Sequence, residues 1–350
     1  MRRGHLEALR PVCPVCRAGA PLSLKSVLKE EDGHVFEGLL GCPTPSCQRE
    51  YPILDGIPLL LVDLRGYVNG AIDQITARED FDAITESLLG DCCGPGSSFD
   101  ITRQHLSTYA WDHYGDLDPD ETGEAGSILR VLERGLELAG AVPEGPILDL
   151  GCAVGRSSFA LADGNRLVLG VDLGYAMLRM ASEVLRRSRA RYPRRRVGIV
   201  YDRRDFPVIL PRTEAVDFWL CDAIDLPFQE GTFAAIVGLN VLDCVTDPHA
   251  LLASLPRLLR PRGKAILSTP YDWSPRATPL GSWIGGHSQR GENAGASEPV
   301  LRALLTPGGH PASIEGLRIV AEETSIPWRV RMHERSSVEY RVDLVVAARD

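Results

Sequence analysis

The sequence predicts an α/β fold in which a covered, mostly parallel sheet follows a small cysteine-rich module. From residue 126 onward, short apolar runs alternate with helical patterns, which indicates a parallel sheet covered on both faces. A glycine-rich turn, GCAVG, joins the first of these strands to a helix, and two close cysteine pairs lie near the N-terminus. We therefore expect a cysteine module over 1–66, a connecting helical or lid region over 67–125 and an α/β domain over 126–350.

The composition indicates a folded protein with a large core. The chain of 350 residues is 44% hydrophobic, which is enough for the cores of about two domains. Its net charge of -9 argues against general affinity for nucleic acid. The first residues, MRRGHLEALRP, lack the apolar stretch of a signal peptide, and no run approaches the roughly 18 apolar residues of a membrane span. We expect a cytoplasmic protein with no membrane partner.

Two cysteine pairs in the N-terminal module have the spacing of a zinc site. Cys13 and Cys16 are separated by two residues, and Cys42 and Cys47 by four, with proline and glycine beside them. Two such turns facing one another supply the four thiolates that zinc prefers, so we expect a structural Zn²⁺ ion here. The alternative is four ordinary free cysteines. An Asp-Gly turn and an apolar strand follow in YPILDGIPLLL.

The remaining cysteines carry weaker signals. Cys152, Cys221 and Cys244 lie in apolar segments, so we expect them to be small buried side chains. Cys92 and Cys93 precede Gly-Pro-Gly, which favours a mobile loop over a thiol-reactive or metal-binding site.

The alternating pattern gives the order of elements in the α/β domain, and ligands of such a sheet bind at the carboxyl ends of its strands. An inserted hairpin is expected over 194–210, and a terminal pair of strands over 326–349. The other expected elements are helices over 125–140, 155–163, 174–192 and 247–263, and strands over 145–152, 166–173, 215–223, 232–240 and 264–271.

The turn after the first strand indicates which nucleotide the domain binds. Gly151 permits a tight turn, and Gly155 lets the following helix approach the strand closely. Asp149 precedes the turn, where a carboxylate repels a pyrophosphate and suits a ligand that carries an ammonium and a sulfonium. Asp172 ends the second strand, seventeen residues after Gly155, where an acid accepts hydrogen bonds from both ribose hydroxyls. A nicotinamide enzyme is disfavoured, because it leaves Asp149 and the stretch 222–228 unexplained.

The stretches ILDLGCAVG, VLGVDL, CDAIDLPF and LRPRGKAILSTP, in this order, resemble the class I S-adenosylmethionine-dependent methyltransferases over about residues 126–350. The resemblance implies a Rossmann-like seven-stranded sheet and S-adenosylmethionine as the methyl donor. Ala153 departs from the family, in which many members have glycine at this position. By position, the residues implied to bind the donor are Asp149, Gly151, Cys152, Ala153 and Gly155 around the turn, Asp172 at the ribose, Leu173, Asp222 and Ala223 at the adenine, and Asn240 facing the donor.

A second resemblance concerns the methyl acceptor. GCAVGRSSF, NVLDCVTDP, LSTPYDWS and WIGG are similar to stretches of the methyltransferase domain that ends ovothiol synthases, which methylates a ring nitrogen of a thiolated histidine. This resemblance implies a small-molecule acceptor with a reactive nitrogen or sulfur, such as a thiohistidine-like metabolite. The cysteine module departs from that family, which carries iron-dependent modules in its place, so the substrate stays open.

Six residues are our candidates for the acceptor pocket: Asn240, Asp243 and Tyr271 in catalysis, and Arg156, Tyr271, Trp273 and Trp283 in substrate binding. Asp243 orients or deprotonates a ring N–H in this hypothesis, and its alternative role is a helix N-cap. In the same hypothesis Arg156 binds a substrate carboxylate through two parallel hydrogen bonds from its guanidinium. The alternative is that Arg156 forms a structural ion pair. For Trp273 and Trp283 the alternative is core packing.

Two further features bear on partners. The pattern CPVC…C…C…YPILDGIPLLL, over about residues 9–63, resembles small zinc-ribbon proteins that activate tRNA and protein methyltransferases, which implies a partner protein for this module. Residues 179–204 hold ten arginines and two acids, which indicates either a phosphate-binding patch for RNA or a solvated helix end and hairpin. The alternatives to a small-molecule enzyme are therefore a zinc-ribbon rRNA or tRNA base methyltransferase, with RNA the less favoured partner, and a donor-binding scaffold without turnover.

Overall fold

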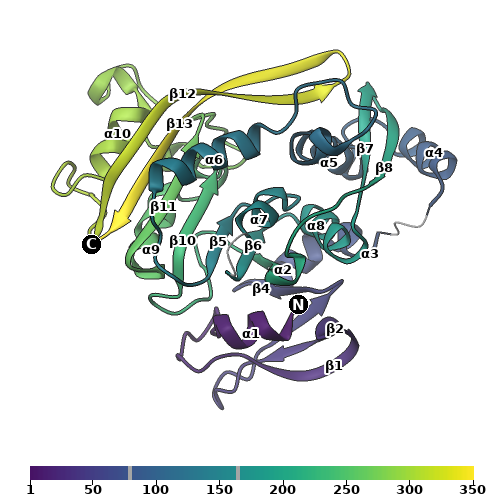
Figure 1. Ribbon diagram of the computed structural model, residues 1–350, viewed down its shortest axis with the longest axis horizontal. Helices are drawn as coiled ribbons and strands as arrows, with labels where there is room; N and C mark the ends of the chain where they lie inside the picture. Colours follow the sequence, from purple (N-terminus) through teal and green to yellow (C-terminus); the bar gives the residue numbers. More distant parts are fainter. Residues whose placement is uncertain (78–80, 163–165) are drawn as a thin grey trace.

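The largest sheet of the protein runs from the N-terminal module through the α/β domain. The computed structural model describes residues 1–77, 81–162 and 166–350. The eleven strands of this sheet lie in the order β1-β2-β3-β4-β9-β6-β5-β10-β11-β13-β12 (Figure 1). The cysteine module and the α/β domain are therefore continuous through shared strand pairing.

The last seven strands of this order form the α/β domain, as the sequence predicts. Parallel strands lie in the middle, and the antiparallel terminal pair lies at one edge. The bounds are β5 Ile147–Leu150, β6 Val168–Asp172, β9 Val216–Cys221, β10 Phe233–Leu239, β11 Leu259–Thr269, β12 Leu317–His333 and β13 Ser336–Arg349.

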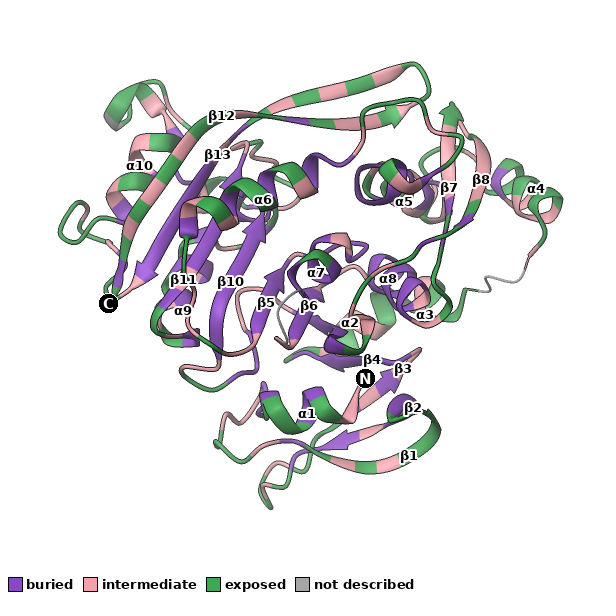
Figure 2. Ribbon diagram, viewed as in Figure 1, coloured by how far each residue is buried: buried purple, intermediate pink, exposed green. Residues whose placement is uncertain are grey.

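Helices cover both faces of this sheet, so its central strands are buried along their length (Figure 2). Ile147 packs in one hydrophobic cluster with α6, α7 and α8, whereas the adjacent Leu148 packs in another with α9 and α10, because successive side chains of a strand point to opposite faces. The helices are α6 Ser127–Ala139, α7 Arg156–Leu161, α8 Tyr175–Arg187, α9 Pro248–Leu258 and α10 Ser297–Leu304. The last residue of the helix expected over 155–163 lies outside the described residues.

Two of the expected helices end earlier than the sequence pattern indicates. At Ser188 the backbone turns left-handed, with φ 52°, and β7 (Arg189–Val197) then pairs with β8 (Val200–Pro207) as the inserted hairpin. The helix expected over 247–263 ends at Leu258, because the next residues extend β11 and include Pro261, which cannot donate a helical hydrogen bond.

The connecting region is helical, as expected. Its helices are α2 Leu64–Gly70, α3 Ile72–Thr76, α4 Ala83–Cys93 and α5 Ser98–Tyr114, and residues 78–80 lie outside the description. Cys92 and Cys93 are exposed at the end of α4 rather than in the expected loop. The short 3-10 helices are η1 Gly115–Leu117, η2 Thr213–Ala215, η3 Leu242–Cys244, η4 Leu280–Ser282 and η5 Glu292–Gly295. None of the described helices is long and apolar enough to cross a membrane.

The N-terminal module joins the domain through its last strand. Helix α1 (Arg3–Leu9) precedes β1 Ser23–Glu31, β2 His34–Gly41, β3 Glu50–Leu54 and β4 Ile57–Leu60. The expected Asp-Gly turn connects β3 to β4, with positive φ at both of its residues, as type I′ hairpin turns require. Strand β4 pairs antiparallel with β3 and parallel with β9, so it belongs to both parts of the protein.

A buried carboxylate secures the same junction. Asp217 of β9 is almost fully buried; it accepts hydrogen bonds from the backbone N–H of Arg2 at 2.7 Å and from the indole of Trp219 at 2.9 Å. His34 lies 3.9 Å from its other oxygen, and the buried His5 donates to backbone carbonyls of the domain. The module is therefore packed into the domain and shares its core.

Candidate active site

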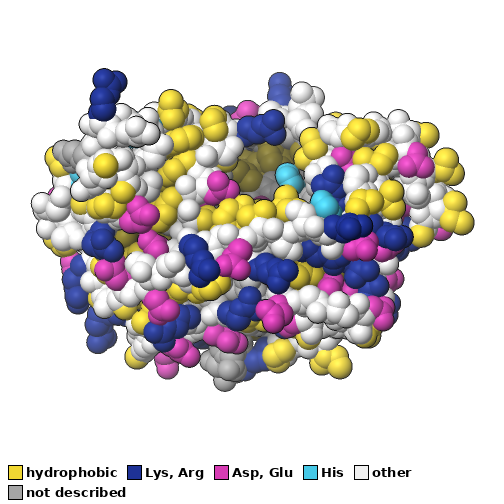
Figure 3. All heavy atoms as spheres, turned by 90° about the horizontal axis from the view of Figure 1, so that it is seen from above, with side chains coloured by type: hydrophobic (Ala, Val, Ile, Leu, Met, Phe, Trp, Pro, Cys, Tyr) yellow, Lys and Arg dark blue, Asp and Glu magenta, His cyan; other side chains and the backbone are white. Residues whose placement is uncertain are grey.

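The candidate site lies at the carboxyl ends of the parallel strands. In Figure 1 the arrowheads of β5 and β10 point toward the top of the molecule. Figure 3 looks down on that edge and shows a hollow with hydrophobic side chains around it. In open α/β sheets this edge is where ligands bind.

Asp149 is the first acid of the site. It is buried in β5, at 2% exposure, and the hydroxyls of Ser157 and Ser158 both donate to its Oδ2 at 2.6 Å. Burial raises the pKa of Asp149 to about 6, and the two hydroxyls partly oppose this. The two serines of the GRSS segment therefore hold the carboxylate in place, a role that the sequence did not reveal.

The glycine turn wraps closely around the strand ends. At Gly151, with φ 70°, a Cβ would lie 2.8 Å from Val241, and at Gly155, with φ 88°, it would lie 2.6 Å from Phe218. Both glycines are therefore required by conformation and by close approach. Ala153 adopts φ 47°, in the left-handed region that glycine enters at less cost than alanine.

Asp172 ends β6 and braces the same turn. Its carboxylate accepts the backbone N–H of Ala153 at 3.0 Å and that of Gly174 at 2.7 Å, and burial raises its pKa. Beside it, Leu173 is 45% exposed, and its carbonyl accepts the hydroxyl of Tyr67 from α2 at 2.5 Å. An acid next to exposed apolar surface fits a ribose that carries a flat base.

Asp222 and Ala223 follow the next strand, β9. The Oδ1 of Asp222 accepts the N–H of Ile224 at 3.1 Å, which closes a tight turn, and burial raises the pKa of Asp222. Three adjacent strands thus each have an acid at or next to their carboxyl end: Asp149 in β5, Asp172 in β6 and Asp222 directly after β9. Cys152 is fully buried in the turn, as expected, and contributes its backbone to the cradle.

Asn240 and Asp243 lie after β10, on the other side of the glycine turn. Ser268 accepts the backbone N–H of Asn240 at 2.9 Å and donates its hydroxyl to the Asn240 side chain at 2.8 Å. Asp243 is 3% exposed, accepts the N–H of Asp272 at 2.7 Å, and has a pKa raised to about 6, chiefly by burial. The N-cap of α9 is Asp247, so the N-cap alternative for Asp243 does not hold for that helix.

The aromatic candidates are held by partners of their own. Trp273 donates its indole N–H to Ser297 at 3.0 Å, and Trp283 donates to a backbone carbonyl at 2.8 Å. The two rings stack with centroids 6.2 Å apart. This contact favours packing, the alternative to substrate binding, for both tryptophans. Tyr271, with φ 55°, directs its hydroxyl to Asp343 at 3.4 Å. These contacts give all three residues structural roles beside the site.

Arg156 forms the structural ion pair that was the alternative to substrate binding. Its guanidinium lies 3.0 Å from the carboxylate of Asp116, and its backbone N–H donates to Nδ1 of His113 at 3.2 Å. Tyr114, one residue further along α5, donates its hydroxyl to the carbonyl of Val154 at 2.7 Å. The end of α5 is therefore fastened to the glycine turn.

Two residues beside Asp243 complete the acceptor side. Cys244, expected to be buried, is exposed, because η3 turns its side chain out of the core; its Sγ lies 3.9 Å from Asp243. Tyr109 of α5 is 44% exposed, and burial together with the charges of Cys244, Asp172 and Asp243 raises its pKa. Tyr109 therefore lies near acids of both the donor and the acceptor sides.

Most arginines of the arginine-rich segment are paired with acids within the fold. Glu121 is the clearest case, since it lies 3.5 Å from Arg194 of β7 and 2.8 Å from Arg331 of β12. Further pairs are Arg189 with Asp205, Arg196 with Glu334, Arg203 with Glu86, and Arg204 with Asp118 and Asp120. The segment ties the inserted hairpin to the connecting region, which weakens the interpretation of a phosphate-binding patch.

The four cysteines of the N-terminal module meet as the spacing predicts. The Sγ atoms of Cys13, Cys16, Cys42 and Cys47 all lie within 4.8 Å of one another. Sγ of Cys13 lies 3.7 Å from that of Cys47, and Sγ of Cys16 lies 3.6 Å from that of Cys42. A tetrahedron with zinc–sulfur bonds of about 2.3 Å has edges of about 3.8 Å, so the cluster fits this ion.

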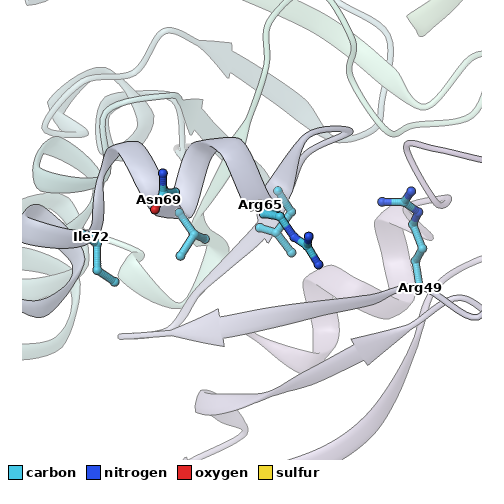
Figure 4. A pocket seen from close by; sticks show the side chains of 6 residues that line it. Arg49, Arg65, Asn69 and Ile72 are labelled. Carbon is cyan, nitrogen blue, oxygen red and sulfur yellow. The ribbon is translucent and has the colours of Figure 1, made fainter.

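A separate groove lies between α2 and the cysteine module. It has a volume of about 510 Å³ and is lined by Leu64, Val68 and Ile72 with Arg49, Arg65 and Asn69. Figure 4 shows these side chains on α2, on α3 and, for Arg49, in the cysteine module. The groove is distinct from the site of the three acids.

Comparison with known proteins agrees with this geometry. Residues 148–267, from β5 to β11, match the family model described as a methyltransferase domain. Residues 148–267 are therefore similar to a methyltransferase domain. The matched stretch contains the glycine turn and the acids Asp149, Asp172, Asp222 and Asp243.

The relatives found by sequence are methyltransferases that align with part of the chain. Ubiquinone biosynthesis O-methyltransferase of Xanthomonas oryzae is 30% identical over 165 residues, which are 47% of this chain and 57% of the relative. Tocopherol O-methyltransferase of Arabidopsis thaliana is 23% identical over 170 residues, 45% of this chain and 42% of the relative. The chain thus spans about half the length of the curated relatives it matches.

Among solved structures, an S-adenosylmethionine-dependent methyltransferase of Methanosarcina mazei aligns with 59% of this chain and 92% of its own. The identity is 19% and the TM-score is 0.38.

Proposed function

We propose that this protein transfers a methyl group from S-adenosylmethionine to a nitrogen or sulfur of a small, amino-acid-derived acceptor, such as a thiohistidine-like metabolite. The observation that carries the proposal is the row of three carboxylates, Asp149, Asp172 and Asp222, at the ends of adjacent strands around the glycine turn. A cationic donor with a ribose and an adenine fits this row, because each acid meets one of its polar parts.

Each donor residue has a distinct task in this proposal. Asp149 attracts the positive charge of the methionine part, Asp172 accepts the ribose hydroxyls, and Asp222 accepts the adenine amino group. Leu173 supplies the apolar surface for the base, since nearly half of it is exposed. Asn240 is held by the hydroxyl of Ser268. In this proposal it lines the donor site on the side that faces the acceptor.

Methyl transfer needs an in-line approach of the acceptor and the exclusion of water more than it needs strong acid or base catalysis. The acceptor lone pair forms the new bond to the methyl carbon while the bond from sulfur to that carbon breaks. Asp243 then takes the proton that a methylated imidazole or amine must lose, because its raised pKa lies near neutral pH. Tyr109 covers the reacting groups from α5.

We further propose that the ribbon holds a structural Zn²⁺ ion, with Cys13, Cys16, Cys42 and Cys47 as ligands. The hydroxyl of Tyr51 lies 3.1 Å from Sγ of Cys13 and would support that ligand. The module's principal partner, in this proposal, is the domain of the same chain, because β4 already pairs with β9. An RNA substrate is less favoured, since most arginines of β7 and β8 are paired with acids: Arg189, Arg194, Arg196, Arg203 and Arg204.

A direct experiment tests the proposal. The full chain is incubated with S-adenosylmethionine and a panel of small amines, thiols and imidazoles, without RNA, and S-adenosylhomocysteine is quantified by mass spectrometry. We expect S-adenosylhomocysteine to form only in the presence of acceptors of one chemical class. Turnover only with added RNA would favour the base methyltransferase, and donor binding without any turnover would favour the scaffold.

A further inference from the structure

Arg17 connects the cysteine module to the loop that carries Asp222. It directly follows Cys16, and its guanidinium donates to the carbonyl of Leu226 at 2.8 Å and to that of Asp225 at 3.1 Å. It also forms an ion pair with the side chain of Asp225. One side chain thus spans two regions more than 200 residues apart in the sequence.

The cysteine turn fixes the position of this side chain. The backbone N–H of Arg17 donates to the carbonyl of Cys13 at 3.1 Å, and the residue adopts φ 49°. Its Nε donates to the carbonyl of Pro14 at 3.1 Å, so the guanidinium is held on the turn at one end and on the loop at the other. A non-glycine residue at positive φ costs free energy, which the folding of the cysteine turn must offset.

The loop at the other end forms the adenine side of the donor site. The N–H of Asp225 donates to the carbonyl of Asp222 at 3.1 Å, in the same turn that Ile224 closes onto the Asp222 carboxylate. Leu226 is fully buried in the hydrophobic cluster that also contains Cys13. A shift of the cysteine turn is therefore transmitted to the residue that accepts the adenine amino group.

Additional contacts strengthen the same connection. The N–H of Val12 donates to the carbonyl of Pro227 at 2.9 Å, and the side chain of Gln229 donates to the carbonyl of Gly19 at 3.1 Å. These bonds bring the two segments together, but among the side chains named here only that of Arg17 reaches Asp225 and Leu226 directly.

We propose that Arg17 is a positioning residue that couples the state of the four-cysteine site to the affinity for S-adenosylmethionine. The inference rests on the proposed function, because it assigns the adenine to the Asp222 loop. With the four thiolates gathered around a metal ion, the turn is rigid and the loop is preorganised. Without the ion the turn loosens, and donor binding must also order the loop.

The test compares Arg17→Ala with Arg49→Ala by titration calorimetry with S-adenosylmethionine on the full, metal-loaded chain. Arg49 also belongs to the module but lines the separate groove, which makes it a matched control. We expect Arg17→Ala to raise the dissociation constant about tenfold, with metal content and melting temperature retained, and Arg49→Ala to change it less than twofold. The KM for the donor should rise in parallel, while kcat at saturating donor stays within twofold.

Metal removal gives the second arm. Chelation of the wild-type protein should weaken donor binding by a similar factor, and chelation of Arg17→Ala should add little, because both changes break the same connection. Arg17→Lys, which keeps the charge but cannot span both carbonyls, should behave like Arg17→Ala.

Unchanged donor affinity in folded Arg17→Ala, or in the chelated wild-type protein, would overturn this inference. Should Arg17→Ala not fold, Arg17→Lys decides alone, and wild-type affinity in that variant would equally overturn it. If the wild-type protein bound no S-adenosylmethionine, the proposed function itself would fail, which is a different outcome.

Discussion

The donor side and the acceptor side of the site are built differently. On the donor side, the groups that hold Asp149 and Asp172 come from the adjoining turn, within 19 residues of the acid that they contact. On the acceptor side, Arg156 pairs with Asp116, 40 residues away, and Trp273 with Ser297, 24 residues away. The cradle of Asp149 and Asp172 is thus a product of local sequence, whereas the Asp222 loop, which Arg17 holds, and the acceptor side depend on how distant segments pack.

This difference has a consequence for function. The contacts that hold Asp149 and Asp172 need only the strand, the turn and the helix that follow one another in sequence. The acceptor side is assembled from α5, η3 and β13, so we expect these segments to determine which acceptor binds. The comparison predicts that substitutions on the two sides affect different measured quantities.

The largest expected effect is on the acceptor side. Asp243→Asn removes the proton acceptor while keeping the shape of the side chain, so we expect kcat to fall by about 10²–10⁴-fold. The dissociation constant for S-adenosylmethionine should stay within about twofold, because the donor acids are intact. Steady-state kinetics and calorimetry check both values, and normal turnover in this variant would remove Asp243 from the mechanism.

Asp172→Ala should show the opposite pattern. It removes the acceptor of the ribose hydroxyls and of two backbone N–H groups of the turn, so donor binding should weaken by about 100-fold or more. The exposed Glu315→Ala is the control for loss of one negative charge. An unchanged dissociation constant would show that the ribose lies elsewhere.

The pH dependence of kcat and of donor affinity should also distinguish the two sides. Asp243 has a pKa raised to about 6 and acts as the carboxylate, so kcat should fall about tenfold per pH unit below pH 6 and level off above it. Burial also raises the pKa of Asp149 to about 6, so donor affinity should weaken as the pH falls through the same value. In Asp243→Asn the fall in kcat should disappear while the fall in donor affinity remains. A kcat that rises on acidification would contradict the assigned role.

The smallest expected effect concerns Arg156. Breaking its part-buried ion pair with Asp116 by Arg156→Ala should lower the free energy of unfolding by about 1–2 kcal/mol, with little change in the acceptor KM. Thermal unfolding and kinetics on the same sample check this. A large rise in KM at unchanged stability would instead restore the hypothesis that Arg156 binds a substrate carboxylate.

The alternating strands and the glycine turn predicted where Asp149 and Asp172 lie in the fold, and the family resemblance implied the position of Asp222; their binding of the donor stays a prediction. The same reasoning predicted the order of the domain's strands and the meeting of the four cysteines. These features depend on periodicity and short spacing, which a single sequence displays directly.

The sequence did not reveal several of the contacts that hold the site and the segments around it. No local pattern shows that Ser157 and Ser158 bond Asp149, since they are separated from it by a turn whose shape depends on Ala153 at positive φ. Nothing in the apolar context of Cys244 shows that η3 exposes it. Likewise, the arginines of 179–204 find their acidic partners in segments up to 138 residues away.

The measurement that tests the central claim most directly is a crystal structure of the full chain with S-adenosylhomocysteine. We predict the ribose hydroxyls at the carboxylate of Asp172, the adenine between Leu173 and Asp222, and the ammonium near Asp149. A ligand bound in the groove of Arg49 and Arg65, or a vacant turn at saturating ligand, would contradict the assignment of this strand edge as the donor site.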